Sequence, residues 1–383
     1  MRMYYEWGTH QLHKDREELC GDSIAVSRRA DSVTLALSDG LGSGVKANIL
    51  ATLTTRIAMH LLQNDLPLAE VVETLGRTLP VCEVRKLAYS TFAIAQFFRD
   101  GRTRIVEFDA PSAMLVRGRR LQPVSCEERT ISGKTIRECV VDVQLGDWVV
   151  FVSDGVLNAG IGGLYPLGWG WDQAATYVAQ HAHPGLSAQA LADRLTETVD
   201  ELYAGSPGDD VSVVVIKARR KLAATVLTGP PGAEGVDEQV MSRFIEHPGL
   251  HVVCGGTTAK LAARHLARPL DVDLDTMTPD VPPLARMPGV DLVTEGILTL
   301  TKACELLRDG GARERVRFRT DGAGSLVRLL LNVDHVHFMV GTAVNPAHQN
   351  PSLPGELRMK LSVVREIAEE LRSRGSEISI ETV

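Results

Sequence analysis

The chain has 383 residues, more than one hydrophobic core usually supports, so we expect two domains. With 44% apolar and 23% charged residues it has the composition of a globular protein, and its net charge of −7 argues against nucleic acid, whose binding requires clustered lysine and arginine. No stretch approaches the roughly 20 apolar residues of a membrane helix, and the N-terminal segment lacks the apolar core of a signal peptide. A cytoplasmic protein without membrane partners is therefore expected.

Near the start of the first half, up to residue 217, the spacing of apolar residues changes from that of a strand to that of a helix. Residues 32–38 alternate in character as a strand does, and the glycine-rich sequence DGLGSG ends that strand. Beyond it, apolar residues recur every four positions and share one face of a predicted helix. They are Val45, Ile49, Leu53, Ile57 and Leu61. Residues 66–79 predict a second helix.

The rest of this half is dominated by strands. Residues 90–153 predict strands joined by short polar turns, and the apolar run at 148–152 fits a strand buried on both faces. A helix is expected over 186–203 and a last strand over 211–216. Antiparallel strands with segregated helices predict an α+β fold, a sandwich of sheets flanked by helices.

A short basic run at residues 217–223 separates the two halves of the chain. Beyond it, over residues 223–383, predicted strands alternate with predicted helices, which indicates a smaller, doubly wound α/β domain with a mainly parallel sheet. The strands are expected at 223–228, 251–254, 291–294, 336–340 and 378–382. The helices are expected to begin near Glu238, Thr257, Ile297, Ser325 and Leu357.

The six cysteines show no Cys-x-x-Cys pair and no metal-finger spacing. In a reducing compartment we expect them to be free thiols that pack as small apolar residues. They are Cys20, Cys82, Cys126, Cys139, Cys254 and Cys304.

Four aspartates stand beside predicted strands, each next to a glycine or another acid: Asp22, Asp39, Asp154 and Asp209. Any one of them alone could be a turn residue or a helix cap. Carboxylates that converge raise one another's pKa, and a divalent cation removes that penalty. Oxygen ligands favour Mg²⁺ or Mn²⁺ over Zn²⁺, so the four together predict a metal site.

The motifs GDS, SDGLGSG, SDGV and GDD occur in this order at the four aspartates. In this order they resemble the SpoIIE-type branch of the metal-dependent protein phosphatases, the protein phosphatase 2C superfamily. The resemblance covers residues 1–217, and residues 107–121 are similar to the central hairpin of the family. It implies an α-β-β-α sandwich, in agreement with the pattern of predicted elements.

The resemblance also implies a role for each acidic position. Asp39 would bridge two Mn²⁺ or Mg²⁺ ions, and Asp154 and Asp209 would complete the shell of one ion. Asp22 and the carbonyl of Gly40 would serve the other ion, partly through water.

Other residues around this predicted site have two interpretations. Asp210 matches an acid or amide of the family and is a further candidate ligand. Ser43 and Gly44 either cap the helix that they open or take part in a shift of that helix. The glycine- and aromatic-rich segment 157–171 is either a flap beside the site or a packed surface loop. No basic residue near Asp22 is available to hold a phosphate.

The predicted activity is hydrolysis of phosphoserine or phosphothreonine on a partner protein. Two ions about 4 Å apart make a bridging water reactive, and the resulting hydroxide attacks phosphorus. The resemblance suggests an anti-sigma antagonist as the partner. Two alternatives remain: a hydrolase of small phosphate esters or nucleotides, and a catalytically silent scaffold whose α/β domain senses a ligand.

The second domain has a weaker signal, a strand followed by a glycine turn and a helix. Four residues at this turn could hold an anion or could form only a tight turn with a threonine cap. They are Gly255, Gly256, Thr257 and Thr258. The sequence is neither a Walker motif nor GxGxxG. We expect this domain to bind a small molecule or a partner and to regulate the phosphatase.

Overall fold

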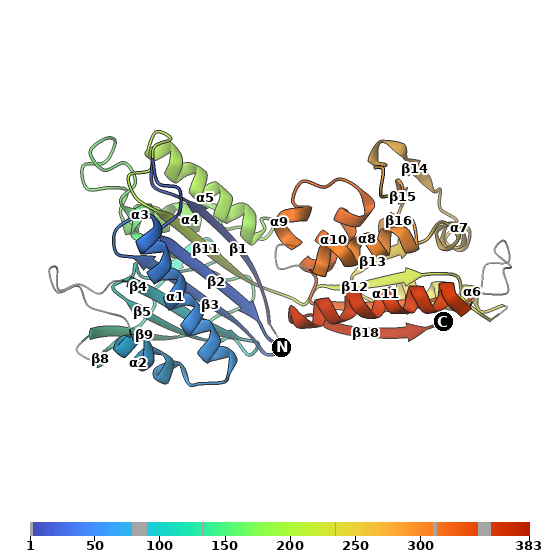
Figure 1. Cartoon of the computed structure of the whole chain (residues 1–383), viewed down its shortest axis with the longest axis horizontal. Coiled ribbons are helices and arrows are strands. Elements are labelled where there is room, and N and C mark those ends of the chain that lie inside the picture. Colours follow the sequence, from blue (N-terminus) through green and yellow to red (C-terminus); the bar gives the residue numbers. More distant parts are fainter. Residues whose placement is uncertain (1–2, 79–89, 132–133, 234, 309–311, 344–353) are drawn as a thin grey trace. The chain divides into compact units, whose positions relative to one another are not determined.

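The computed structural model divides the chain into two compact units, Met1–Arg220 and Lys221–Val383 (Figure 1). Each unit is described here by itself. Within the described residues, no helix combines the length and the apolar character that a transmembrane segment requires. The described residues are 3–78, 90–131, 134–233, 235–308, 312–343 and 354–383.

The first unit contains two sheets in which neighbouring strands are antiparallel. Its strands are β1 (Tyr4–Leu12), β2 (Asp22–Arg28), β3 (Ser32–Gly40), β4 (Ser90–Phe98), β5 (Arg102–Phe108), β6 (Met114–Arg117), β7 (Arg120–Gln122), β8 (Cys126–Ile131), β9 (Lys134–Asp142), β10 (Trp148–Val152) and β11 (Val211–Arg219). One sheet has the order β1-β11-β10-β6-β7, and the other has the order β2-β3-β4-β5-β9-β8. The first and last strands of the unit, β1 and β11, are antiparallel neighbours in one sheet, so the two ends of the unit are held together.

Helices cover the outer face of each sheet (Figure 1). They are α1 (Gly44–Gln63) and α2 (Leu68–Thr78) on the second sheet, and α3 (Asp154–Leu157), α4 (Trp171–His181) and α5 (Ala188–Leu202) on the first. Buried side chains form three layers: Leu75 packs between α2 and its sheet, Leu191 packs under α5, and the rings of Phe97 and Phe151 meet edge to face between the sheets. The predicted α-β-β-α sandwich is confirmed.

Helix α1 packs with a different face from the apolar stripe that the sequence shows. Val45, Ile49 and Leu53 are 57%, 59% and 47% exposed, whereas small residues such as Ala47 and Ala51 are fully buried. Small side chains bring the helix close to β3, and a Cβ at Gly40 would overlap the backbone of Ala47. The spacing therefore predicts the helix correctly but does not show which face is buried.

The second unit is a doubly wound α/β layer, as predicted. Its strands are β12 (Ala223–Thr228), β13 (Leu250–Cys254), β14 (Asp271–Asp273), β15 (Leu284–Met287), β16 (Val290–Thr294), β17 (His335–Val340) and β18 (Glu377–Thr382). In the sheet order β14-β15-β16-β13-β12-β17-β18, the strands from β16 to β18 are parallel. The pair β14 and β15 extends one edge with antiparallel strands. These two strands are too short and too polar for an alternation of apolar and polar residues to predict them from the sequence.

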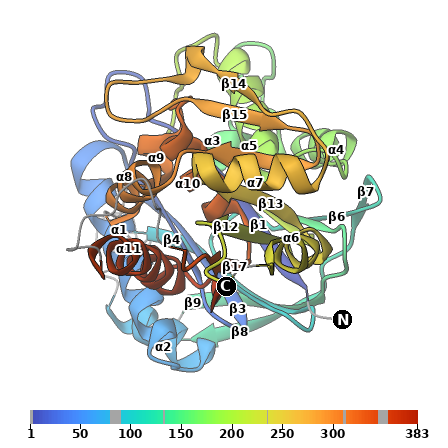
Figure 2. The same ribbon diagram turned by 90° about the vertical axis from the view of Figure 1, so that its right-hand side faces the viewer.

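Helices cover both faces of this sheet (Figure 2). Helices α6 (Asp237–Glu246) and α7 (Gly256–His265) enclose one core. Helices α8 (Ile297–Arg308), α10 (Gly322–Asn332) and α11 (Pro354–Ser373) enclose the other, beside the short α9 (Ala312–Val316). The central strand β12 is therefore almost entirely buried, because helices cover both of its faces.

The prediction that all cysteines are free thiols is wrong for one pair. Cys126 and Cys139 form a disulfide. They lie directly opposite each other in the antiparallel pair β8 and β9, a proximity that their spacing of 13 residues does not reveal. Cys82 lies outside the described residues. The free thiols among the described residues are Cys20, Cys254 and Cys304.

Candidate metal centre

Two of the predicted ligands face each other on neighbouring strands. Asp22 begins β2, Asp39 lies next to the end of β3, and the two residues are direct partners in the antiparallel register. Asp22 is almost completely buried. Like charges placed directly opposite on a sheet are destabilising, so this pair requires compensation by a proton or a cation.

The other sheet contributes the remaining acids. Asp154 is exposed and begins α3 two residues after β10 ends, and Asp209 and Asp210 immediately precede β11. Because β10 and β11 are antiparallel partners, the end of one strand lies beside the start of the other. Gly155 lies so close to the Asp210 backbone that a Cβ would overlap it, so the backbone here requires glycine.

The pKa of Asp39 shows that the acids from the two sheets converge. This pKa is raised to about 9, and burial is the largest cause, although part of the residue reaches the surface. The other causes are the charges of Asp22 and Asp154, a hydrogen bond with Asp154 and the charge of Asp209. The four aspartates that the sequence selects therefore lie in one cluster, drawn from both sheets of the sandwich.

Asp22 is perturbed in the same direction. Its pKa is raised to about 7, with burial as the largest cause. Hydrogen bonds from Ser212 and Ser153 lower this pKa, and the charges of Asp210 and Asp154 raise it. One oxygen of Asp22 and one oxygen of Asp210 are buried without a hydrogen-bond partner. Buried polar atoms are almost always satisfied in folded proteins, so these oxygens fit ligands of a cation.

Asp209 stands at the rim of the cluster. Burial is the first cause of its raised pKa and the charge of Asp154 is the second. Its carboxylate accepts a hydrogen bond of 3.0 Å from the backbone N–H of Asp210, whose own carboxylate accepts one of 3.0 Å from the N–H of Lys14. These bonds fix the turn from which both side chains project.

The arrangement is open rather than a tight cage. Among the described residues, one group of three potential metal ligands has its ligand atoms within 4.8 Å of one another. It consists of Glu107, Cys126 and Cys139, and its two sulfurs form the disulfide. The aspartates are more widely spaced. Such spacing leaves room for water in the coordination shell of a hard cation.

The residues around Asp39 are placed as follows. Gly40 lies so close to α1 that a Cβ would overlap the helix, and this contact is enough to explain why the position is a glycine. The role of the Gly40 carbonyl as a metal ligand therefore stays a prediction. Ser43 is the first residue before α1, but its hydroxyl donates to Glu17 at 2.9 Å and does not cap the helix. The interpretation of Ser43 as a side-chain cap is wrong, because a carboxylate from the β1–β2 loop competes for its hydroxyl.

A pocket of about 490 Å³ opens beside Asp209. The glycine-rich segment after α3, including Ile161, forms one wall, and Leu202 and Tyr203 at the end of α5 form another. The hydroxyl of Tyr203 donates to the carbonyl of Gly155 at 2.7 Å, which ties this wall to the residue after Asp154. The segment 157–171 therefore lies beside the cluster, and Trp169 within it is buried.

The glycine turn of the second unit leads directly into α7. Gly255 adopts a φ of 129°, and Gly256 begins α7, where Thr257 and the buried Thr258 follow. The carboxylate of Glu295 lies against Gly256 and already places a negative charge at the start of this helix. Anion binding by these four residues stays a prediction.

Fold and site together define an α-β-β-α domain with an acidic centre, the architecture of a PP2C-type phosphatase. Residues 29–219 match the model of the family described as Stage II sporulation protein E (SpoIIE). The first unit of this chain therefore belongs to the SpoIIE family, as its motifs predict. This family depends on Mn²⁺ or Mg²⁺.

Solved structures with a similar fold include other phosphatase domains. The phosphatase domain of SpoIIE from Bacillus subtilis is 19% identical over 57% of this chain and 94% of that chain, with a TM-score of 0.44. The SiaA-PP2C domain of Pseudomonas aeruginosa is 18% identical over 55% and 85%, with a TM-score of 0.43. The S. agalactiae serine/threonine phosphatase is 15% identical over 56% and 99%, with a TM-score of 0.42. No curated protein sequence matches this chain.

Proposed function

We propose that the first unit is a serine/threonine phosphoprotein phosphatase that works with two Mn²⁺ or Mg²⁺ ions. One observation supports this most strongly: acids from both sheets raise one another's pKa, and the charge of Lys14, which lowers the pKa of Asp209, has less effect there than burial or Asp154. Membership of the family supports hydrolysis of phosphorylated protein as the reaction. The acidic cluster is where we propose that the ions bind.

Each acid has a proposed task. Asp39 sits where both halves of the cluster meet, so it holds both ions; Asp154 and Asp209 hold one of them. Asp22 and the Gly40 carbonyl hold the other, and Asp210 orients the turn before β11 and offers a further oxygen. When bound, the ions activate water for attack on phosphorus and neutralise the phosphoryl oxygens.

The pocket beside Asp209 would receive the substrate chain. Its described lining has no lysine or arginine, so the phosphate charge has to be met by the ions rather than by a side chain there. Its wall includes apolar residues and flexible glycines, which suits a peptide segment next to the phosphorylated residue. The partner would be a phosphorylated regulatory protein, for which an anti-sigma antagonist is the specific proposal.

The test compares substrates and variants. With Mn²⁺ the protein should release phosphate from phosphoserine peptides, and Asp39→Asn or Asp154→Asn should lower kcat/KM by at least about 100-fold. The exposed Asp172→Asn is the matched control and should retain activity. Faster hydrolysis of nucleotides than of phosphopeptides would favour a small-ester hydrolase, and no hydrolysis at all would favour a silent scaffold.

We propose further that the second unit binds a small ligand or a partner and regulates the first. Its parallel strands have the order β16-β13-β12-β17-β18. The chain continues from β12 to β13 on one side and from β17 to β18 on the other, so the strand order reverses between β12 and β17. Ligands of doubly wound folds bind at such a switch point, beyond the carboxyl ends of the strands. The Lys360 ammonium lies at this edge and donates to the carbonyl of Gly341 at 3.5 Å, so it places a positive charge beside the proposed site.

A thermal-shift screen of the full chain with nucleotides and phosphorylated metabolites tests this regulatory role. A ligand that raises the melting temperature should also change phosphatase activity. Lys360→Met should remove the shift, whereas Lys302→Met, which removes a half-buried lysine of α8 paired with Glu305, should not. If neither ligand nor deletion of the unit changes activity, regulation by this unit is excluded.

A further inference from the structure

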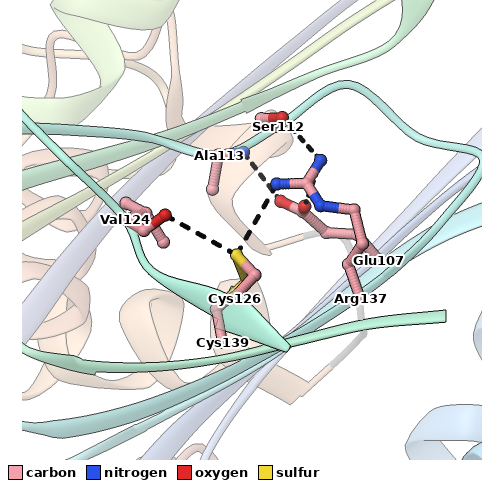
Figure 3. Close-up of a disulfide and its surroundings, with 7 residues drawn as sticks. All are labelled: Glu107, Ser112, Ala113, Val124, Cys126, Arg137 and Cys139. Carbon is pink, nitrogen blue, oxygen red and sulfur yellow. Dashed lines mark hydrogen bonds and ion pairs between the residues drawn. A yellow bond between two sulfur atoms is a disulfide. The ribbon is translucent and has the colours of Figure 1, made fainter. Parts of the chain in front are cut away.

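A second cluster of reactive groups lies away from the aspartates, where the chain crosses between the two sheets of the first unit. The chain leaves β7 of one sheet at Gln122 and enters β8 of the other sheet at Cys126. β8 is the edge strand of its sheet and pairs with β9. The disulfide from Cys126 to Cys139 therefore fixes the point at which the crossing segment joins the sheet (Figure 3).

An ion pair between a buried carboxylate and a half-buried guanidinium adjoins the disulfide. Arg137 donates to the sulfur of Cys126 at 3.6 Å and to the hydroxyl of Ser112 at 2.7 Å, and it lies 3.3 Å from the Glu107 carboxylate (Figure 3). Glu107 is 2% exposed and accepts the N–H of Ala113 at 2.7 Å. The same guanidinium thus contacts the disulfide and the loop before β6.

A pocket of about 410 Å³ is bounded by these groups. The crossing segment, including Pro123 and Val124, forms one wall, and Arg137 and Ser112 form another. Trp171 closes it and donates to the carbonyl of Ser112 at 2.8 Å. The disulfide, the ion pair and the pocket are therefore one connected arrangement.

We propose that Cys126 and Cys139 are a reversible thiol–disulfide modification site that sets the shape of this pocket. The two sulfurs differ in access, because Cys126 is half-buried whereas Cys139 is fully buried. Only Cys126 contacts the guanidinium of Arg137. A nearby guanidinium favours the thiolate, which is the form that reacts. The proposal does not depend on the phosphatase activity.

Reduction requires a thiol reductant and proceeds in two exchanges. A reductant thiolate attacks the sulfur of Cys126, the S–S bond breaks, and Cys139 leaves as a thiolate that takes up a proton. A second reductant thiolate attacks the reductant sulfur of the mixed disulfide and releases Cys126, which is also protonated. The reductant supplies both electrons and ends as its own disulfide. A small-molecule disulfide reverses both steps.

The reduced state changes the crossing segment. The covalent link between β8 and β9 is lost, and the Cys126 thiol gains a hydrogen that it can donate to the Val124 carbonyl, 3.8 Å away. Val124 lines the pocket, so its backbone responds directly to the state of the sulfur. Residues 121–126 should therefore exchange amide hydrogens faster in the reduced protein.

The full chain is equilibrated in buffers with a graded ratio of reduced to oxidised glutathione, alkylated, and mapped by mass spectrometry. We expect Cys126 and Cys139 to convert together within the series while the protein stays folded. Hydrogen exchange at residues 121–126 should rise by about tenfold on reduction. A pair that stays oxidised until the protein unfolds, a pair that never oxidises, or equal exchange in both states would overturn the proposal.

Two sets of variants make the test specific. Cys126→Ser with Cys139→Ser should abolish the exchange response to glutathione, whereas Cys254→Ser should preserve it. Arg137→Gln should slow re-oxidation by about threefold, because the Cys126 thiolate loses its neighbouring guanidinium while its higher intrinsic nucleophilicity offsets part of the loss. Arg129→Gln, which removes an exposed arginine of β8, should not slow it.

Discussion

The first unit buries carboxylates in two contrasting environments. At the aspartate cluster, Asp22 and Asp39 are surrounded mainly by other acids, and the pKa of each rises well above its usual range. At the disulfide, the buried Glu107 lies beside the guanidinium of Arg137. The pKa of Glu107 is raised by burial and lowered by the Ala113 N–H and by Arg137. A buried acid with an internal cation serves structure, whereas acids without one need a cation from solution.

The largest effect should come from Asp39, which is central to the uncompensated cluster. At 1,000 times its dissociation constant, Mn²⁺ should raise the free energy of unfolding by about 4.1 kcal/mol. Asp39→Asn should remove most of that gain, because the variant loses the residue shared by both ions. Thermal unfolding with and without Mn²⁺ measures it, and Asp172→Asn should behave as the parent. An unchanged gain in Asp39→Asn would show that the ions bind elsewhere.

The next effect should come from separating the compensated pair. Arg137→Gln leaves Glu107 buried without its cation and should lower the free energy of unfolding by about 3 kcal/mol. Arg129→Gln breaks an exposed pair with Glu138 and should change stability by less than about 1 kcal/mol. Urea unfolding of both variants makes the comparison. Equal losses would mean that burial does not distinguish the two arginines.

Removal of the disulfide should have a somewhat smaller effect. Cys126→Ser with Cys139→Ser should lower the free energy of unfolding by about 2 kcal/mol, at the low end for disulfides because the β8–β9 pairing already restricts the loop. The parent protein should lose the same amount when a reductant is added to the urea series, and the double variant should lose nothing further. A reductant effect that persists in the double variant would assign it to another cysteine.

The smallest effect concerns pH. The pKa of Glu107 is raised in the folded protein, so between its unfolded and folded values the native state holds a proton that the unfolded state has lost. Its contribution to stability is therefore present at low pH and declines as pH rises through that window. Glu107→Gln should flatten the decline that begins near the unfolded glutamate pKa of about 4.3. A decline that is identical in the variant would assign the pH dependence to other groups.

Much of the fold and part of the cluster could be predicted because their signals are local. Apolar alternation in residues 32–38 and the continuous run at 148–152 are properties of single strands, and both match observed strands. The aspartates were found because each stands at a strand end beside glycine or another acid. Asp154 and Asp209 illustrate this, since their motifs place them at one rim of their sheet.

Other features could not be predicted because they depend on which strands become neighbours. The Cys126–Cys139 disulfide exists because β8 folds back on β9 in one particular register. The pairing of Arg137 with Glu107 requires β9 to lie beside β5, and no short-range pattern indicates it. The exposed stripe of α1 is a similar case, because the small residues on its other face pack more closely than large ones can.

The sequence alone determined the elements, their order, the division into a sandwich and an α/β layer, and the acids available to a cation. The tertiary structure decided which acids lack a partner, which arginine compensates the buried glutamate and which cysteines meet. The physical reason is that periodicity and turn chemistry act over a few residues, whereas burial and charge depend on atoms brought together from distant parts of the chain.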